Sequence, residues 1–112
     1  METNCRSWPG QGHYDRSVAI GRSARRAERQ PRVEALFGER AAPAALDVLE
    51  LTEFAWHDCY GEITPGDDVI DDILACSRGD LGELARAARL AVEDRRDLAL
   101  WAAAARARAT KP

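Results

Sequence analysis

Apolar residues recur every three or four positions along most of the chain, and short segments containing Gly or Pro separate these stretches. This spacing is typical of amphipathic helices and not of strands, in which apolar and polar residues alternate. It predicts helices over residues 43–60, 65–78 and 81–108, and a short helix over residues 32–37. We therefore expect an all-α fold, a small helical bundle of three main helices plus a short N-terminal helix.

Turn-forming and capping residues support these bounds. Thr64 is placed to cap the second main helix, and Asp80 to cap the last one, with Glu83 completing a capping box. Gly61 is a natural stop for the first main helix. An unbroken last helix would be about 42 Å long, which is long for so small a domain. We therefore expect a kink near residues 94–97.

The N-terminal part of the chain lacks this regular pattern. Residues 17–30 predict at most a frayed basic helix, interrupted early by Gly21. Segments without an apolar period and with isolated charges rarely fold alone. We therefore expect a disordered basic arm over residues 1–30 and a helical domain over residues 31–109. Deletion of the arm should then leave the melting temperature nearly unchanged.

A helical wheel assigns an inner face to each main helix. In the first, this face comprises Val48, Leu49, Leu51, Thr52, Ala55, Trp56 and Cys59, and in the second, Val69, Ile70, Ile73 and Leu74. In the last, it comprises Leu81, Leu84, Ala85, Ala88, Ala91, Val92, Ala99 and Ala102. The opposite side of the first main helix carries Glu50, Glu53, Phe54 and His57, which we expect in solvent.

Three large apolar residues fall outside these inner faces. Phe54 lies among acidic residues of its helix, and Leu90 and Trp101 lie with charged residues of the last helix. Several large apolar residues on outer faces indicate a surface that another molecule covers. The sequence therefore predicts an interaction surface at Phe54, Leu90 and Trp101. The alternative is that the short helix or a kinked last helix covers them and they belong to the core.

The composition also favours a partner. Among 112 residues, 21 are Ala, and Leu, Ile, Val and Phe together number 21. The core of such a chain is thin, and thin cores often gain stability from association. We expect a protein partner or a homo-oligomer, no cofactor and no catalytic residue.

The segment "DDVIDD", residues 67–72, is the strongest candidate for metal chemistry. It contains D-D-x-x-D, which resembles the Mg²⁺-diphosphate motif of prenyl transferases and terpene synthases. Helical carboxylates four residues apart can hold a hard cation, so Asp67, Asp68 and Asp71 are candidate ligands. Those enzymes have a second acidic motif, which this chain lacks. The alternative is that Asp is favoured in the first turn of a helix by the macrodipole.

The segment "WHDCY", residues 56–60, offers no convergent site, because neighbours in a helix point in different directions. We expect a solvated His57 paired with Glu53, and a buried Cys59. Cys76 should lie roughly 15 Å from Cys59, too far for a disulfide. An odd number of Cys and an N-terminus without an apolar secretion segment favour reduced thiols in the cytoplasm.

The charge distribution argues against a nucleic-acid-binding regulator. Five Arg fall between residues 22 and 32, but residues 41–80 hold ten acidic residues and one Arg, and this acidic body would repel phosphates. No stretch approaches the 18 apolar residues that a membrane span needs.

Residues 46–98, and the stretch "AWHDCYGEITP" in particular, resemble small uncharacterised helical proteins of high-GC actinobacteria. The resemblance implies a bacterial cytoplasmic setting and no activity. The sequence thus favours a cytoplasmic helical accessory or interaction protein. A Mg²⁺-dependent phosphate- or diphosphate-binding protein or enzyme remains the alternative, and a nucleic-acid-binding regulator is a further alternative.

Overall fold

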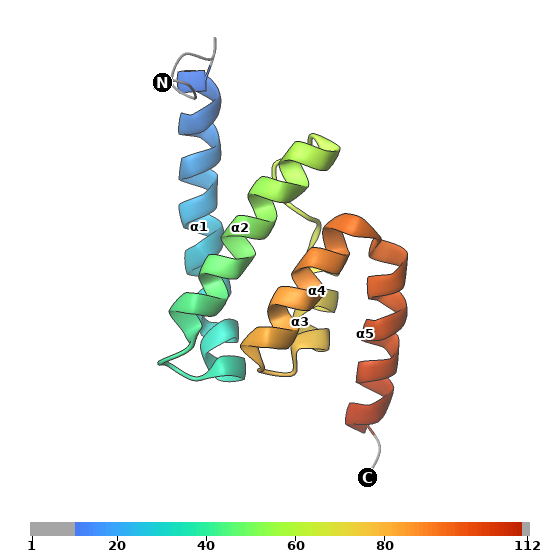
Figure 1. Ribbon diagram of the computed structural model, residues 1–112. Helices are drawn as coiled ribbons and strands as arrows, with labels where there is room; N and C mark the ends of the chain where they lie inside the picture. Colours follow the sequence, from blue (N-terminus) through green and yellow to red (C-terminus); the bar gives the residue numbers. More distant parts are fainter. Residues whose placement is uncertain (1–10, 111–112) are drawn as a thin grey trace.

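The computed structural model describes the backbone of residues 11–110 and the side chains of residues 21–110, and the described part is all-helical, which confirms the predicted fold class (Figure 1). This part contains five helices and not the expected three plus one short helix. They are α1 (Gln11–Phe37), α2 (Ala42–Tyr60), α3 (Asp67–Ser77), α4 (Leu81–Glu93) and α5 (Arg95–Thr110).

Helix α4 occupies the middle of the bundle and packs against α2, α3 and α5, while α1 packs against α2 (Figure 1). Helices α2 and α4 run in the same direction, and α5 returns beside α4 in the opposite direction. The largest fully buried apolar side chains are Leu49, Trp56, Ile73, Leu84 and Leu98. Alanines at the contacts of α4, such as Ala87 and Ala91, let these short helices approach closely.

The last predicted helix is broken at Asp94, within the segment where we expect a kink. The backbone of Asp94 is extended, with φ −160° and ψ 91°. Its carboxylate accepts hydrogen bonds from the backbone N–H groups of Arg96 (3.1 Å) and Asp97 (3.3 Å) and so caps α5. The break lets α5 fold back and bury Leu98 and Ala102 instead of extending into solvent.

The N-terminal segment differs from the expected disordered arm. Residues 11–37 form one helix that continues through Pro31, and residues 1–10 lie outside the described part. Proline inside a helix costs about 3 kcal/mol, so contacts with the rest of the protein have to offset this cost. Val33, which is fully buried, and the arginines described below provide them.

Gly38, Gly61 and Asp80 act at helix ends as predicted, and Thr64 does not. Gly38 and Gly61 adopt left-handed backbone conformations after α1 and α2, and the Asp80 carboxylate accepts the backbone N–H of Glu83 at 2.9 Å. The expected Thr64 cap is wrong, because α3 begins at Asp67 with Gly66 as its N-cap and no side-chain cap. The Thr64 hydroxyl instead binds Glu53.

The predicted inner faces are confirmed for α3 and are rotated for α2. Val69, Ile70, Ile73 and Leu74 are all buried. On α2, Leu49, Thr52 and Trp56 are buried, but Leu51 is 66% exposed and Cys59 is also exposed. Glu53, expected in solvent, is only 2% exposed. On α4, Leu84, Ala88 and Ala91 are buried, whereas Leu81 and Ala85 are exposed.

The turn between α3 and α4 requires glycine at position 79. Gly79 has φ +80°, and a Cβ atom there would lie 2.7 Å from the backbone oxygen of Leu36. We predict that Gly79→Ala destabilises the protein by more than Gly38→Ala, whose position also has positive φ but has nothing within 4 Å of a Cβ atom. Gly38→Ala should cost about 1–2 kcal/mol, the conformational cost alone. Equal losses in urea unfolding would show that the contact with Leu36 does not matter.

Candidate interaction surface

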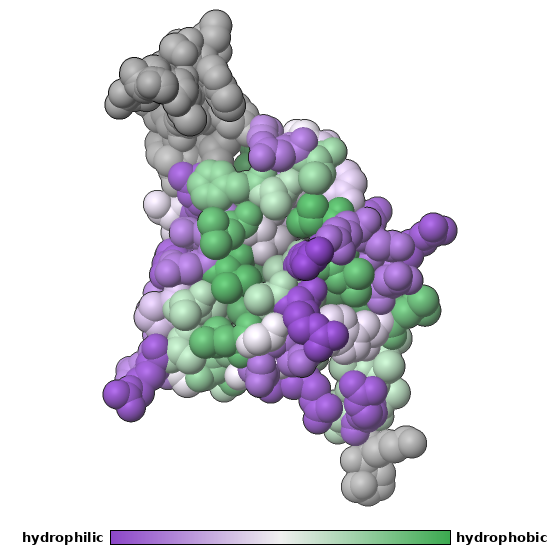
Figure 2. Space-filling view, viewed as in Figure 1, coloured by the Kyte–Doolittle hydropathy of each residue, from purple (hydrophilic) through white to green (hydrophobic). Residues whose placement is uncertain are grey.

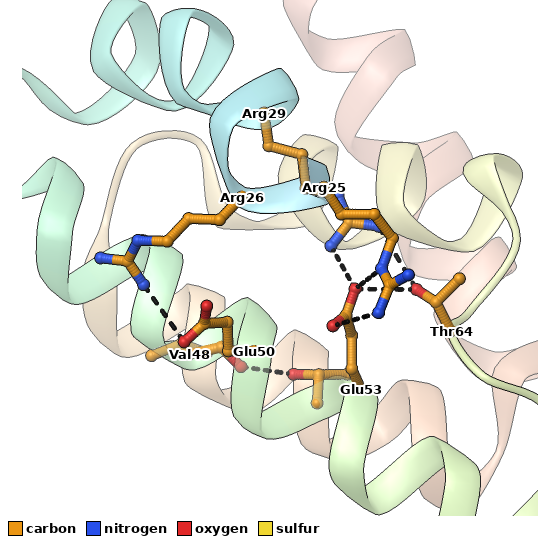
Figure 3. Close-up of polar contacts among 8 residues, drawn as sticks. Arg25, Arg26, Arg29, Val48, Glu50, Glu53 and Thr64 are labelled. Atoms are coloured by element: carbon orange, nitrogen blue, oxygen red, sulfur yellow. Dashed lines mark hydrogen bonds and ion pairs between the residues drawn. The ribbon is translucent and has the colours of Figure 1, made fainter. Parts of the chain in front are cut away.

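The most buried charged group in the described part of the chain is Glu53, on the side of α2 that faces α1. Arg25 binds this carboxylate with two nitrogens, Nε to Oε2 at 2.6 Å and Nη2 to Oε1 at 3.1 Å. Arg29, one turn further along α1, donates from Nη1 to Oε2 at 2.9 Å, and the Thr64 hydroxyl donates to the same oxygen at 3.0 Å. Figure 3 shows both arginines reaching from α1 to Glu53. The cluster fixes α1 and the α2–α3 loop to α2.

Burial alone would raise the pKa of the Glu53 carboxyl, and burial is the largest single influence on it. The hydrogen bonds from Arg25 and Thr64 and the charges of Arg25 and Arg29 together outweigh burial, so the pKa lies below its ordinary value of 4.5. Glu53 is therefore ionised at neutral pH and fully engaged in holding helices together, which leaves it unavailable as an acid or base for catalysis.

The carboxylates of "DDVIDD" are divided between two roles. Asp67 and Asp68 lie exposed in the first turn of α3, where the helix dipole favours them. Asp71 binds Arg32 of α1 at 2.6 Å, and Asp72 binds Arg106 of α5 at 2.8 Å. Within the described residues, no group of three or more His, Cys, Asp or Glu side chains could hold a metal ion. The structure thus places Asp71 in an ion pair between helices.

The residues of "WHDCY" also lie in different surroundings and do not form one site. We expect His57 to pair with Glu53; that carboxylate binds Arg25 and Arg29, and the Nδ1 atom of His57 lies 3.1 Å from the Glu62 carbonyl oxygen. Cys59 is exposed, which corrects its predicted burial, and Cys76 is buried. Burial is the main cause that raises the pKa of Cys76 to about 11, so this thiol is protonated at neutral pH. Both cysteines are free, as expected from their separation.

The three residues of the predicted interaction surface lie in two places. Phe54 is half-exposed on α2, with the Arg22 guanidinium 4.5 Å from the centre of its ring. Leu90 and Trp101 are partly buried against the core and line a hollow between α4 and α5, where Arg86 lies 5.9 Å above the Trp101 ring. The kink at Asp94 brings them together, so these two contribute to packing as the alternative interpretation expects.

A different apolar surface lies between α2 and α4. It is an open groove of about 390 Å³. Its lining comprises Val48, Leu51, Thr52 and Ala55 of α2 and Ala85, Ala88, Arg89, Val92 and Glu93 of α4. Figure 2 shows apolar side chains, in green, along α2 on the face that Figure 1 presents to the viewer, with hydrophilic side chains, in purple, over much of α4. We call this surface the α2–α4 groove.

The groove has a shallow floor and a projecting edge. Ala55, Ala85 and Ala88 have side chains of a single methyl group, and Leu51 beside them is 66% exposed. At its C-terminal end, the Tyr60 hydroxyl donates to the Val92 carbonyl oxygen at 2.8 Å and ties the two helices together. Helices α2 and α4, which form the two walls, are thus fixed relative to each other, and no large side chain fills the space between them.

Sequence reasoning missed the groove because it assigned Val48, Leu51 and Ala55 to the core. The groove could have been recognised in the sequence from the width of the apolar faces of the two helices. Both α2 and α4 carry more apolar positions than one buried stripe needs, and the excess positions of both helices meet in the groove.

Comparison of the chain with protein-family models, curated proteins and solved structures finds no significant match.

Because Glu53 is buried with two arginines, we predict that Glu53→Gln lowers the free energy of unfolding by about 3 kcal/mol or more, the cost of leaving buried charges unpaired. Asp47→Asn is the matched control, since Asp47 binds Arg26 at 2.8 Å but is 66% exposed. The control should lose less than about 1 kcal/mol. Chemical denaturation of the two variants gives both values.

The wild type and Glu53→Gln together test how the stability of the fold depends on pH. A carboxyl whose pKa is lower in the folded than in the unfolded protein stabilises the fold above its unfolded pKa, and this stability is lost as the pH falls through the folded pKa. Stability of the wild type should therefore decline below pH 4.5 more steeply than that of Glu53→Gln. Parallel declines would contradict the assignment of Glu53 as an acid-sensitive group.

Deletion of residues 1–30 removes Arg25 and Arg29 and leaves Glu53 without its cations. In contrast to the expectation from sequence, we predict that this deletion lowers the melting temperature by roughly 10 °C or more. Deletion of residues 1–10 serves as the control, because it leaves every ion pair described above in place. A melting temperature that both deletions leave unchanged would show that α1 contributes nothing to the fold.

Proposed function

We propose that this protein is a small helical accessory protein that binds another protein chain through the α2–α4 groove. The observation that carries the proposal is the exposure of Leu51, at 66%, on the edge of a groove that both walls line mainly with apolar side chains. A contiguous exposed apolar surface, as opposed to a single exposed apolar residue, marks interaction sites in proteins.

The ionic chemistry of the described residues supports a binding role over a catalytic one. Glu53, Asp71 and Asp72 bind arginines of neighbouring helices and stabilise the fold. The groove itself carries Arg89 and Glu93, which bind each other at 2.8 Å. Charged groups are thus paired among themselves beside an apolar surface, as they are at the rim of a protein–protein interface.

The setting we propose is the cytoplasm of a bacterium. One observation supports it: the free thiols of Cys59 and Cys76 are compatible with a reducing compartment. The resemblance to small actinobacterial proteins that we infer from the sequence is part of the same proposal. In the part of the chain that the structure describes, no helix has both the length and the apolar character to cross a membrane.

Substitution at the groove tests the proposal. We predict that Leu51→Asp abolishes capture of a partner from native cells, because a charge at the centre of an apolar contact is left desolvated and unpaired. The matched control is Leu100→Asp, since Leu100 is 70% exposed on α5 and lies outside the groove. The measurement is quantitative mass spectrometry of proteins that co-purify with each tagged variant.

A partner that the wild type and Leu100→Asp retain and that Leu51→Asp loses supports the proposal. Identical sets of co-purifying proteins for all three chains, together with an unchanged mass of the protein itself, would refute it. Both positions are exposed, so neither substitution should change the melting temperature by more than a surface change does, within about 0.5 kcal/mol.

A further inference from the structure

We propose that the N-terminal part of α1, residues 11–30, is held closed against α2 by ion pairs and opens about a hinge at Pro31 while the rest of the protein stays folded. We call residues 11–30 the arginine segment and residues 32–37 the anchor. The inference goes beyond the α2–α4 groove and does not depend on it, because α1 contributes no residue to that groove.

The arginine segment is attached to α2 through its guanidinium groups. Between residues 21 and 30, where its side chains are described, none is buried, and apart from Gly21 the partly buried residues are all arginines. The apolar side chains of this stretch, Ala24 and Ala27, are exposed. The arginines reach acidic residues of α2 (Figure 3), in the pairs Arg25–Glu53, Arg29–Glu53, Arg26–Asp47 and Arg26–Glu50. Charge therefore holds this segment in place, and apolar burial does not.

The anchor is attached in a different way. Val33 is fully buried in the core, and Phe37 packs against the core partly buried. Salt screens the attraction between charges, whereas apolar burial does not depend on charge. The two parts of α1 should therefore respond differently to ionic strength, the arginine segment strongly and the anchor weakly.

Pro31 lies at the boundary between these two parts. Proline has no backbone N–H, so the helical hydrogen bond to the carbonyl oxygen of Ala27 is missing, and the proline ring crowds that carbonyl group. The backbone of α1 is thus weakest between Ala27 and Pro31. At the first position of a helix, in contrast, proline is favoured, because an N–H there has no helical partner. A helix that begins at Pro31 is therefore a stable form of the anchor, and it corresponds to the short helix that the sequence predicts over residues 32–37.

Opening separates opposite charges and gives both sides to water. Both cations that Glu53 binds in the described part of the chain belong to the arginine segment. When that segment leaves, water can solvate the Glu53 carboxylate, and Asp47 and Glu50 lose their contacts with Arg26. A helix without packing contacts is marginal in water. The open segment therefore loses its helical hydrogen bonds, and its backbone amides exchange with solvent.

Hydrogen exchange of the backbone amides in the full-length chain tests the inference. The rates of residues 22–29 are compared with those of residues 35–37, which keep their helical hydrogen bonds in the open form. We expect residues 22–29 to exchange faster than residues 35–37. The difference should grow about three- to tenfold between about 0.01 M and about 1 M sodium chloride, where the screening length falls from about 30 Å to about 3 Å.

One variant tests the ion pairs. Glu53→Gln should accelerate exchange of residues 22–29 relative to residues 35–37 by about tenfold or more, because it removes the charge that two arginines share. Glu93→Gln is the matched control, since it breaks an ion pair within α4, and it should leave this ratio unchanged.

A second variant tests the hinge. Pro31→Ala restores the missing backbone hydrogen bond and should slow exchange of residues 22–29 by about tenfold or more. Pro43→Ala is its control, because Pro43 lies in the first turn of α2, where the helix needs no N–H from it, and it should not slow this exchange.

Three results would overturn the inference. If residues 22–29 exchange at the same rate as residues 35–37 in every chain, α1 opens only when the whole protein unfolds. If neither salt nor Glu53→Gln accelerates their exchange, ion pairs do not hold the segment. If Pro31→Ala leaves their exchange unchanged, Pro31 is not the hinge. None of these results bears on the proposed function, whose test changes Leu51.

Discussion

The fold depends on the burial of one carboxylate, that of Glu53. A buried charge is costly unless opposite charges and hydrogen bonds replace the water that it loses. Arg25 and Arg29 supply the charges from consecutive turns of α1, and Thr64 supplies a further hydrogen bond from the loop after α2. The Glu53 carboxylate thus holds α1, α2 and the loop after α2 together, and removal of α1 would leave its charge without a cation.

The position of Glu53 also sets the orientation of α2. At about 100° per residue, Glu53 lies about 40° around the helix from Leu49, and Leu51 lies about 160° from it. Because Leu49 and Glu53 both face the interior, Leu51 faces outward. Val48 and Ala55 lie on the same side of α2 as Leu51, next to α4. The exposed groove is therefore a consequence of the same contact that fixes α1.

Local features of the fold could be predicted from sequence, and the contacts across it could not. Gly38, Gly61 and Asp80 act through their own neighbours, and the inner stripe of α3 is a period of three and four that needs no partner. Glu53 binds arginines that lie 24 and 28 residues away in the sequence. Glutamate is usually exposed to solvent, so the residues around Glu53 do not indicate that it is buried in an ion pair. For this reason α1 resembles a disordered arm in sequence, and the apolar face of α2 was assigned a different orientation.

Helix α2 is apolar on more than one side, and this property connects its structural role with the binding role that we propose. One side carries Leu49, Glu53 and Trp56 toward the core and α1, and another presents Leu51 and Ala55 in the groove. A helix with apolar residues on most of its circumference is normally covered on most of it. The core and α1 cover the first of these sides. The second side stays open between α2 and α4, because the alanines that line the groove have only methyl side chains and do not fill it.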